Sequence, residues 1–84
     1  MTDSTSAQHD ELTVLDATGL LCPEPVMLLH KTINTLPAKS RIRMIATDPS
    51  SERDVAKFCH FLGHELISFE KTADEYFEFM IQKL

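Results

Sequence analysis

The clearest candidate for chemistry in this sequence is the segment Cys22-Pro23-Glu24-Pro25, where one thiol stands beside two prolines. Proline is favoured at the first position of a helix, so the segment predicts a helix that begins at Pro23, directly after the thiol. The N-terminus of a helix stabilises an anion by ~0.3–1 kcal/mol, which lowers a thiol pKa only modestly. We therefore expect Cys22 to be a sulfur nucleophile or carrier, because a moderate pKa lets sulfur both accept and release a partner atom.

A structural thiol packed under the helix is the alternative for Cys22, and it is the preferred interpretation for Cys59. Cys59 stands between Phe58 and His60 on a predicted helix whose apolar stripe includes it, and a buried free cysteine behaves as a small hydrophobe. A bridge between the two cysteines stays open at this level. Because the chain has only these two and its first residues do not resemble a secretion signal, we expect reduced thiols and a cytoplasmic location.

The other titratable clusters give weaker signals. His60 and His64 are four residues apart, a spacing that can bind zinc on one helix face, but Gly63 predicts that the helix ends between them. A complete metal site would need the distant Cys22 or His30, so we interpret the pair as capping or surface histidines and expect no cofactor. Helix capping and an acid–base group explain one further set equally well. Its residues are Asp48, Pro49, Arg53 and Asp54.

Composition bounds the classes of function. The formal net charge is −5 over 84 residues, which disfavours a broad nucleic-acid surface because phosphate contacts need clustered Lys and Arg. Arg41 and Arg43 alternate on one predicted strand face and are best interpreted as part of a solvated sheet face. No apolar run approaches the ~20 residues that span a bilayer. We expect a disordered N-terminal tail over residues 1–11 and a single domain over residues 12–84, without membrane contact.

The elements that must position Cys22 follow from apolar periodicity. The expected strands are 12–15, 41–47, 66–69 and 76–81, and the expected helices are 23–35 and 52–62. The order βαβαββ, with half-polar strands, predicts an α+β two-layer sandwich in which a mixed four-stranded sheet carries both helices on one face.

The same periodicity predicts the core. The expected inward-facing residues of the helices are Val26, Leu29, Ile33, Leu36, Val55, Phe58, Cys59 and Leu62. Those of the strands are Ile42, Met44, Ala46, Phe77, Phe79 and Ile81. The phenylalanines are interpreted as core rather than as a ligand cage, including Phe61 and Phe69.

A family resemblance extends this interpretation. The segment Leu15-Asp16-x-x-Gly19-Leu20-x-Cys22-Pro23-x-Pro25 resembles the signature of the TusA (SirA/YhhP) family of small sulfur-carrier proteins. A second block, Phe58-Cys59-x-Phe61-x-x-His64-Glu65-Leu66, together with Asp48-Pro49 and Arg53-Asp54, extends the likeness over residues 12–84. The resemblance implies a sandwich similar to the C-terminal domain of a bacterial initiation factor.

The resemblance also implies an activity. Family members accept persulfide sulfur from a cysteine desulfurase on the cysteine that matches Cys22, and the enzyme class implied is a sulfurtransferase. The acceptor implied is a TusBCD-type relay complex that serves 2-thiolation of tRNA wobble uridine, and the family is also associated with molybdenum-cofactor sulfur supply. The only intermediate implied is a covalent cysteine persulfide. The residues that match the motif and would position the thiol are Asp16, Gly19, Pro23, Glu24 and Pro25.

One departure and three alternatives accompany this resemblance. Relatives often have a basic residue just before the cysteine, where this chain has Leu21, so local stabilisation of a thiolate is weaker here. The alternatives are a non-enzymatic regulatory or interaction module, a small RNA-binding domain and a thiol–disulfide oxidoreductase. Cys22 lacks the C-x-x-C partner that the last of these needs, and the acidic composition counts against direct nucleic-acid binding.

Overall fold

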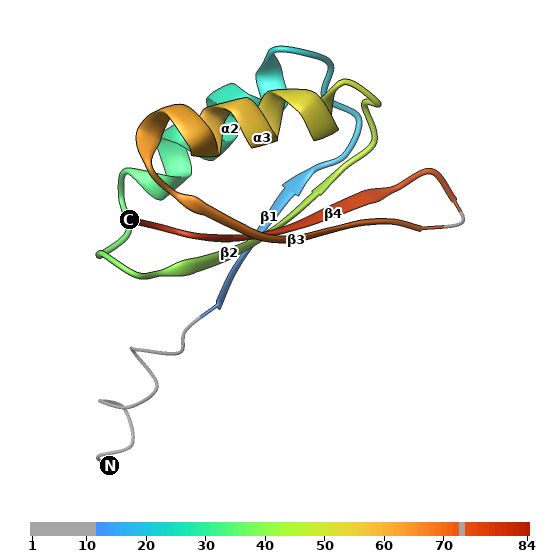
Figure 1. The fold of residues 1–84 in the computed structure, drawn as a ribbon. Helices are drawn as coiled ribbons and strands as arrows, with labels where there is room; N and C mark the ends of the chain where they lie inside the picture. The colour runs from blue at the N-terminus through green and yellow to red at the C-terminus, as the bar shows by residue number, and fades with distance from the viewer. Residues whose placement is uncertain (1–11, 73) are drawn as a thin grey trace.

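The computed structural model describes residues 12–72 and 74–84. The tail predicted over residues 1–11 therefore lies outside the described residues, as does Ala73 in the predicted connection between the last two strands. The predicted element order is confirmed (Figure 1). The elements are β1 (Leu12–Ala17), α2 (Glu24–Ile33), β2 (Arg41–Ala46), α3 (Ser51–Leu62), β3 (Glu65–Lys71) and β4 (Phe77–Gln82).

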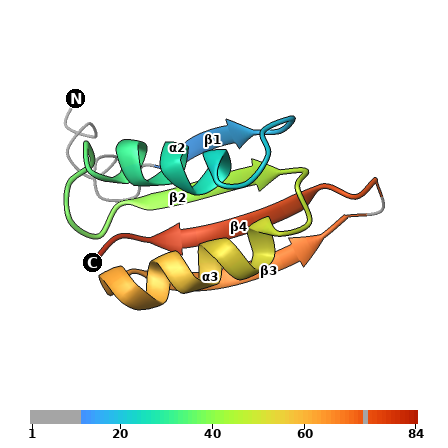
Figure 2. The same ribbon diagram turned by 90° about the horizontal axis from the view of Figure 1, so that it is seen from above.

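The four strands form one mixed sheet in the order β1-β2-β4-β3. β1 and β2 are parallel, with Leu12 opposite Arg41 and Ala17 opposite Ala46. β4 is antiparallel to both β2 and β3. The carboxyl ends of β1 and β2 therefore meet at one edge of the sheet, and the loops that lead into α2 and α3 start there side by side (Figure 2).

Both helices cover the same face of the sheet, as the sequence predicts (Figure 1). Seen from above, α2 lies over β1 and β2, and α3 lies over β4 and β3 (Figure 2). The predicted inward faces of β2 and β4 are confirmed, with Ile42, Met44, Ala46, Phe77, Phe79 and Ile81 buried. From the helices, Leu29, Ile33, Val55, Phe58 and Cys59 close the core, and Val26, Leu36 and Phe69 pack against it. Each fully buried large apolar side chain contributes ~1.5–3 kcal/mol to this packing.

The helix ends differ from the predicted bounds by one or two residues for local reasons. Pro23 is the residue before α2 rather than its first residue, and Pro25 is buried inside the first turn. At the other end, Thr35 and Leu36 donate to carbonyls only three residues back, because Pro37 disfavours helical backbone in the residue before it. α3 begins at Ser51, one residue earlier than predicted.

The prediction is wrong for two core residues: Phe61 is 78% exposed and Leu62 is 43% exposed. Phe61 lies beside, and not within, the buried face of α3 that is formed by Val55, Phe58 and Cys59. Leu62 shares that stripe but occupies the last turn of α3, and Gly63 ends the helix directly after it in the left-handed conformation, at φ +82°. Both side chains line a surface groove instead.

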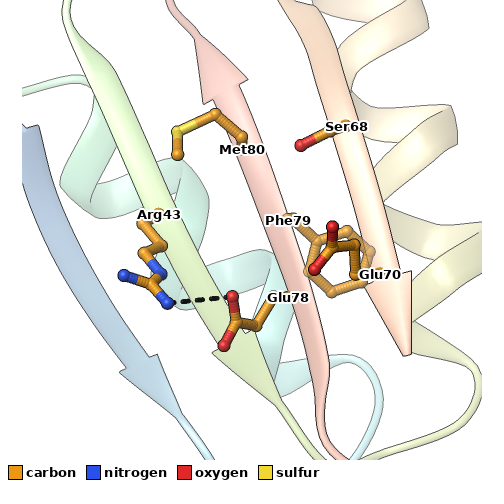
Figure 3. Close-up of a pocket in the computed structure, with 6 residues that line it drawn as sticks. All are labelled: Arg43, Ser68, Glu70, Glu78, Phe79 and Met80. Atoms are coloured by element: carbon orange, nitrogen blue, oxygen red, sulfur yellow. Dashed lines mark hydrogen bonds and ion pairs between the residues drawn. The ribbon is translucent and has the colours of Figure 1, made fainter. Parts of the chain in front are cut away.

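The second face of the sheet carries no helix among the described residues. A shallow hollow of about 180 Å³ lies on it, lined by Arg43, Ser68, Glu70, Glu78, Phe79 and Met80 (Figure 3). Arg43 Nη2 lies 3.0 Å from Glu78 Oε1 across the β2–β4 pair, and Arg41 Nε donates to Gln82 Oε1 at 3.4 Å. These contacts confirm that the two arginines belong to a solvated sheet face. None of the helices in the described part of the chain is long and apolar enough to cross a membrane.

Candidate functional site

Cys22 lies exposed in the loop between β1 and α2, two residues before the first helical residue. The Glu24 backbone N–H donates to the Leu21 carbonyl at 2.8 Å, and the Met27 N–H donates to the Pro23 carbonyl at 3.1 Å. The peptide bond between Cys22 and Pro23 is cis. The thiol is thus presented just ahead of the helix, as predicted, but the helix begins at Glu24 rather than at Pro23, so the predicted start is corrected by one residue. Glu24 is exposed beside it.

Asp16 and Gly19 hold the start of this loop. Asp16 Oδ1 accepts hydrogen bonds from the Thr18 backbone N–H at 3.0 Å and from the Thr18 hydroxyl at 2.7 Å, and these bonds lower the pKa of Asp16. Gly19 has φ +81°, a conformation that glycine adopts without steric cost. Its N–H donates to Thr47 Oγ1 at 2.9 Å. The motif residues therefore tie the Cys22 loop to the end of β2.

Asp48 makes a second connection between the two loops. Its Oδ2 accepts the backbone N–H of Cys22 at 2.5 Å. Its Oδ1 accepts the Ser50 N–H at 3.1 Å and the Ser50 hydroxyl at 3.0 Å. The pKa of Asp48 is lowered by the hydrogen bonds from Ser50 and Cys22. One carboxylate thus fixes the backbone of Cys22 relative to the start of α3.

Asp54 contacts the sulfur itself. Cys22 Sγ donates to Asp54 Oδ2 at 2.9 Å, and this hydrogen bond raises the pKa of the Cys22 thiol. The predicted lowering of this pKa is therefore wrong. The sulfur lies before α2, and a carboxylate faces it directly, so the effect of the helix end is outweighed.

Asp48 and Asp54 were foreseen as a group, but their contact with Cys22 was not. Both capping and acid–base roles were open for them at the sequence level, and neither interpretation involved the thiol. A signal was nevertheless present, since Asp48 follows β2 and Cys22 follows β1. Two loops that follow adjacent parallel strands meet at the same sheet edge.

Beside the thiol runs an apolar groove between α2 and α3, with a volume of about 370 Å³. It is lined by Cys22, Pro23, Val26, Asp54, Lys57, Phe58, Phe61 and Leu62. Phe61 and Leu62, the two residues wrongly predicted as core, form part of its exposed apolar lining. The sulfur thus stands at the edge of a hydrophobic surface.

The remaining candidates lie elsewhere. Cys59 is only 2% exposed, and burial raises its pKa to about 11, so its prediction as a core residue is confirmed. Both cysteines are free. His64 Nδ1 accepts the Leu84 backbone N–H at 3.0 Å, and His60 is exposed beside Phe61. Across residues 12–72 and 74–84, no group of three His, Cys, Asp or Glu side chains is placed to hold a metal ion.

The arrangement defines a small two-layer domain that displays one thiol, and its fold is known from a solved structure. A crystal structure of a SirA-like protein from Desulfitobacterium hafniense superposes with a TM-score of 0.76 and covers 83% of this chain and 95% of its own. The sequence identity is 21%, so this likeness shows the fold alone.

Sequence comparison identifies the family. The family model described as Sulfurtransferase TusA matches residues 13–83. Sulfur carrier protein TusA of Pseudomonas syringae pv. tomato is 54% identical over 70 residues, which cover 83% of this chain and 82% of that protein. Sulfur carrier protein TusA of Pseudomonas entomophila is 52% identical over 75 residues, 89% of this chain and 91% of that protein. The chain therefore belongs to the TusA family of sulfur carriers.

Proposed function

We propose that this chain carries sulfur as a persulfide on Cys22, accepting it from a cysteine desulfurase and passing it to a TusBCD-type relay complex. The relay would supply 2-thiolation of tRNA wobble uridine. The observation that carries the proposal is the exposed Cys22 thiol in a chain that belongs to a sulfur-carrier family. The turn around Asp16 and the hydrogen bond to Asp48 hold this thiol at one edge of the sheet. The cytoplasm suits this role because thiols stay reduced there.

The proposed transfer is an exchange between a thiol and a persulfide. Cys22 releases its proton to solvent, and its thiolate attacks the outer sulfur of the donor's Cys–S–SH group. The donor's S–S bond breaks, the donor cysteine leaves as a thiolate, and a new S–S bond leaves Cys22 as Cys22–S–SH. No electrons are gained or lost overall, so the exchange needs no redox cofactor. The acceptor's thiolate then repeats the same step on the loaded carrier, which makes the chain a sulfurtransferase in this sense.

The surface around the sulfur supports a protein partner rather than RNA. The groove beside Cys22 is lined by exposed apolar side chains such as Phe61, which are typical of protein contacts. Arg43 is neutralised by Glu78 on the other face of the sheet, and the net charge is −5. Direct binding to the tRNA backbone is therefore not part of the proposal.

The proposal is tested by loading the protein with a cysteine desulfurase and free cysteine and then measuring intact mass. We expect one added sulfur atom on the wild type, none on Cys22→Ser and full loading on Cys59→Ala. Alanine is preferred to serine at Cys59 because a buried hydroxyl would lack a hydrogen-bond partner. Sulfur found on Cys59, or a wild type that no desulfurase loads, would overturn the proposal.

A further inference from the structure

The hydrogen bond between Cys22 and Asp54 exists only while the sulfur keeps its proton. Sγ is the donor and Oδ2 the acceptor, 2.9 Å apart. An ordinary aspartic acid ionises near pH 3.9 and an ordinary cysteine near pH 8.5, so at neutral pH the proton belongs on sulfur. Removing that proton would place a thiolate against a carboxylate. The pair therefore favours the neutral thiol, which is the less reactive form.

Asp54 stands where the helix end stabilises a negative charge and where other side chains compensate little of that charge. Asp54 lies in the first turn of α3, where the helix end stabilises negative charge, and its backbone N–H donates to the Ser50 carbonyl at 3.0 Å. Its side chain is 21% exposed. Arg53 Nε lies 3.6 Å from Oδ1 on a side chain that is 68% exposed, and such an exposed pair compensates little charge. The Arg53 contact therefore leaves the Asp54 carboxylate open to a stronger cation, which would compete with the Cys22 thiol for this side chain.

The other charged groups near the sulfur do not reverse this balance. Asp48 adds a second carboxylate at the Cys22 backbone and raises the pKa of the thiol further, while the Ser50 hydroxyl acts in the opposite direction. Glu24 begins α2 beside the thiol, and Lys57 lines the groove on the α3 side. Two carboxylates therefore contact Cys22, Asp54 at the sulfur and Asp48 at the backbone.

From this geometry we propose that Asp54 gates the Cys22 thiol: its carboxylate holds the free carrier in the protonated form, and a Lys or Arg of a docking partner pairs with Asp54 and releases the thiolate. The release of the thiolate by a partner rests on the proposed function. It deepens that function because it states that a donor or acceptor must bring a cation to Asp54. The same gate would slow the reaction of the exposed thiol with small electrophiles before a partner arrives.

The first half of the gate is tested on the isolated protein. The rate at which iodoacetamide alkylates Cys22 is measured against pH for the wild type and for Asp54→Asn, which keeps a hydrogen-bond acceptor but loses the charge. We expect the Asp54→Asn profile to shift to lower pH, with alkylation at pH 7 faster by roughly two- to fivefold, the size typical of one solvent-screened charge pair. Glu52→Gln, which removes a neighbouring exposed charge, is the matched control, and Asp54→Glu should restore slow alkylation.

A second measurement keeps this test independent of whether the variant folds. Added salt weakens the repulsion between the carboxylate and the thiolate only in part, because the two groups are in contact, so it should move the wild-type profile in the same direction as the substitution but by less. An Asp54→Asn profile that coincides with the wild type, or one that moves to higher pH, would refute the gate. So would a shift of equal size in Glu52→Gln.

The second half of the gate is tested by sulfur loading from a desulfurase at pH 7. Although its thiol is more reactive to iodoacetamide, Asp54→Asn should load more slowly, by roughly two- to fivefold, because the partner's cation loses its anion. Loading that is unchanged or faster would refute the partner's role. If even the wild type is never loaded, the proposed function fails, whereas the alkylation profile still decides whether Asp54 controls the thiol.

Discussion

The two cysteines of this chain have opposite environments with respect to α3. Cys22 is exposed and faces the first turn of α3 through Asp54, whereas Cys59 is a buried residue of its C-terminal half. Both thiols have a raised pKa, but a carboxylate is the main cause at Cys22 and burial is the cause at Cys59. A docking protein can neutralise a carboxylate, but only unfolding relieves burial. Reactivity can therefore be controlled by a partner at Cys22 and not at Cys59.

The largest expected difference between the two sites is in alkylation of the native protein at pH 8. Iodoacetamide should label Cys22 alone, and Cys59 should be protected by a factor of at least ~10³, because its exposure requires unfolding. Mass spectrometry of peptides taken over a time course measures both rates, and full labelling of both thiols in denaturant is the control. If Cys59 of the native protein is labelled at a rate near that of Cys22, the difference in accessibility between the two thiols is refuted.

A smaller difference is expected between two phenylalanines that stand three positions apart on α3. Phe58 is 8% exposed and Phe61 is 78% exposed. Phe58→Ala should lower the free energy of unfolding by ~3–5 kcal/mol, while Phe61→Ala should change it by no more than ~0.5 kcal/mol. Urea unfolding monitored by circular dichroism compares them. If the groove serves docking, Phe61→Ala should also slow sulfur loading, and equal stability losses would contradict the exposure of Phe61.

The smallest expected effect is a pH dependence of stability, which arises from His64 just beyond the end of α3 that carries Cys59. The pKa of His64 is lowered, first by burial and then by Lys83 and His30, and its Nδ1 accepts the Leu84 N–H. Because the folded state binds this proton less readily than the unfolded state, His64 contributes stability above its ordinary pKa of ~6.5 and loses it as pH falls below that value. The unfolding midpoint should therefore decrease modestly between pH 7 and pH 5.

The variant His64→Gln should flatten that decrease, and His60→Gln controls for the loss of any one imidazole. Thermal unfolding at a series of pH values gives the slopes for all three proteins. A wild-type midpoint that rises as pH falls from 7 to 5 would show that the sign is wrong.

How far the sequence predicts this molecule differs between its core and its site. The alternation in β2 and β4 identified their buried residues because successive side chains of a strand point to opposite faces of the sheet. The face that carries the apolar residues is then the buried one. The stripe of α3 identified Val55, Phe58 and Cys59 but failed at Leu62, since periodicity gives the direction of a side chain and not whether anything covers it. The site depends on contacts that span 26 to 32 residues along the chain.

Those contacts were not predicted because they depend on which strands are neighbours in the sheet. Only when β1 and β2 are known to be parallel neighbours do Cys22, Asp48 and Asp54 meet. The motif did identify the thiol and the turn around Asp16 and Gly19, which are local features. The predicted sign of the pKa shift at Cys22 was wrong. The helix that follows the thiol can be recognised from the sequence, but the contact with a carboxylate of another helix cannot.

The place of β4 has a consequence for synthesis on the ribosome. It is the last strand in sequence, yet it lies in the interior of the sheet between β2 and β3. Until its residues leave the exit tunnel, one edge of β2 has no neighbour and Phe79 is missing from beneath the helices. The nascent polypeptide therefore completes its sheet only after translation has passed β4, and until then the unpaired edge of β2 is open to aggregation.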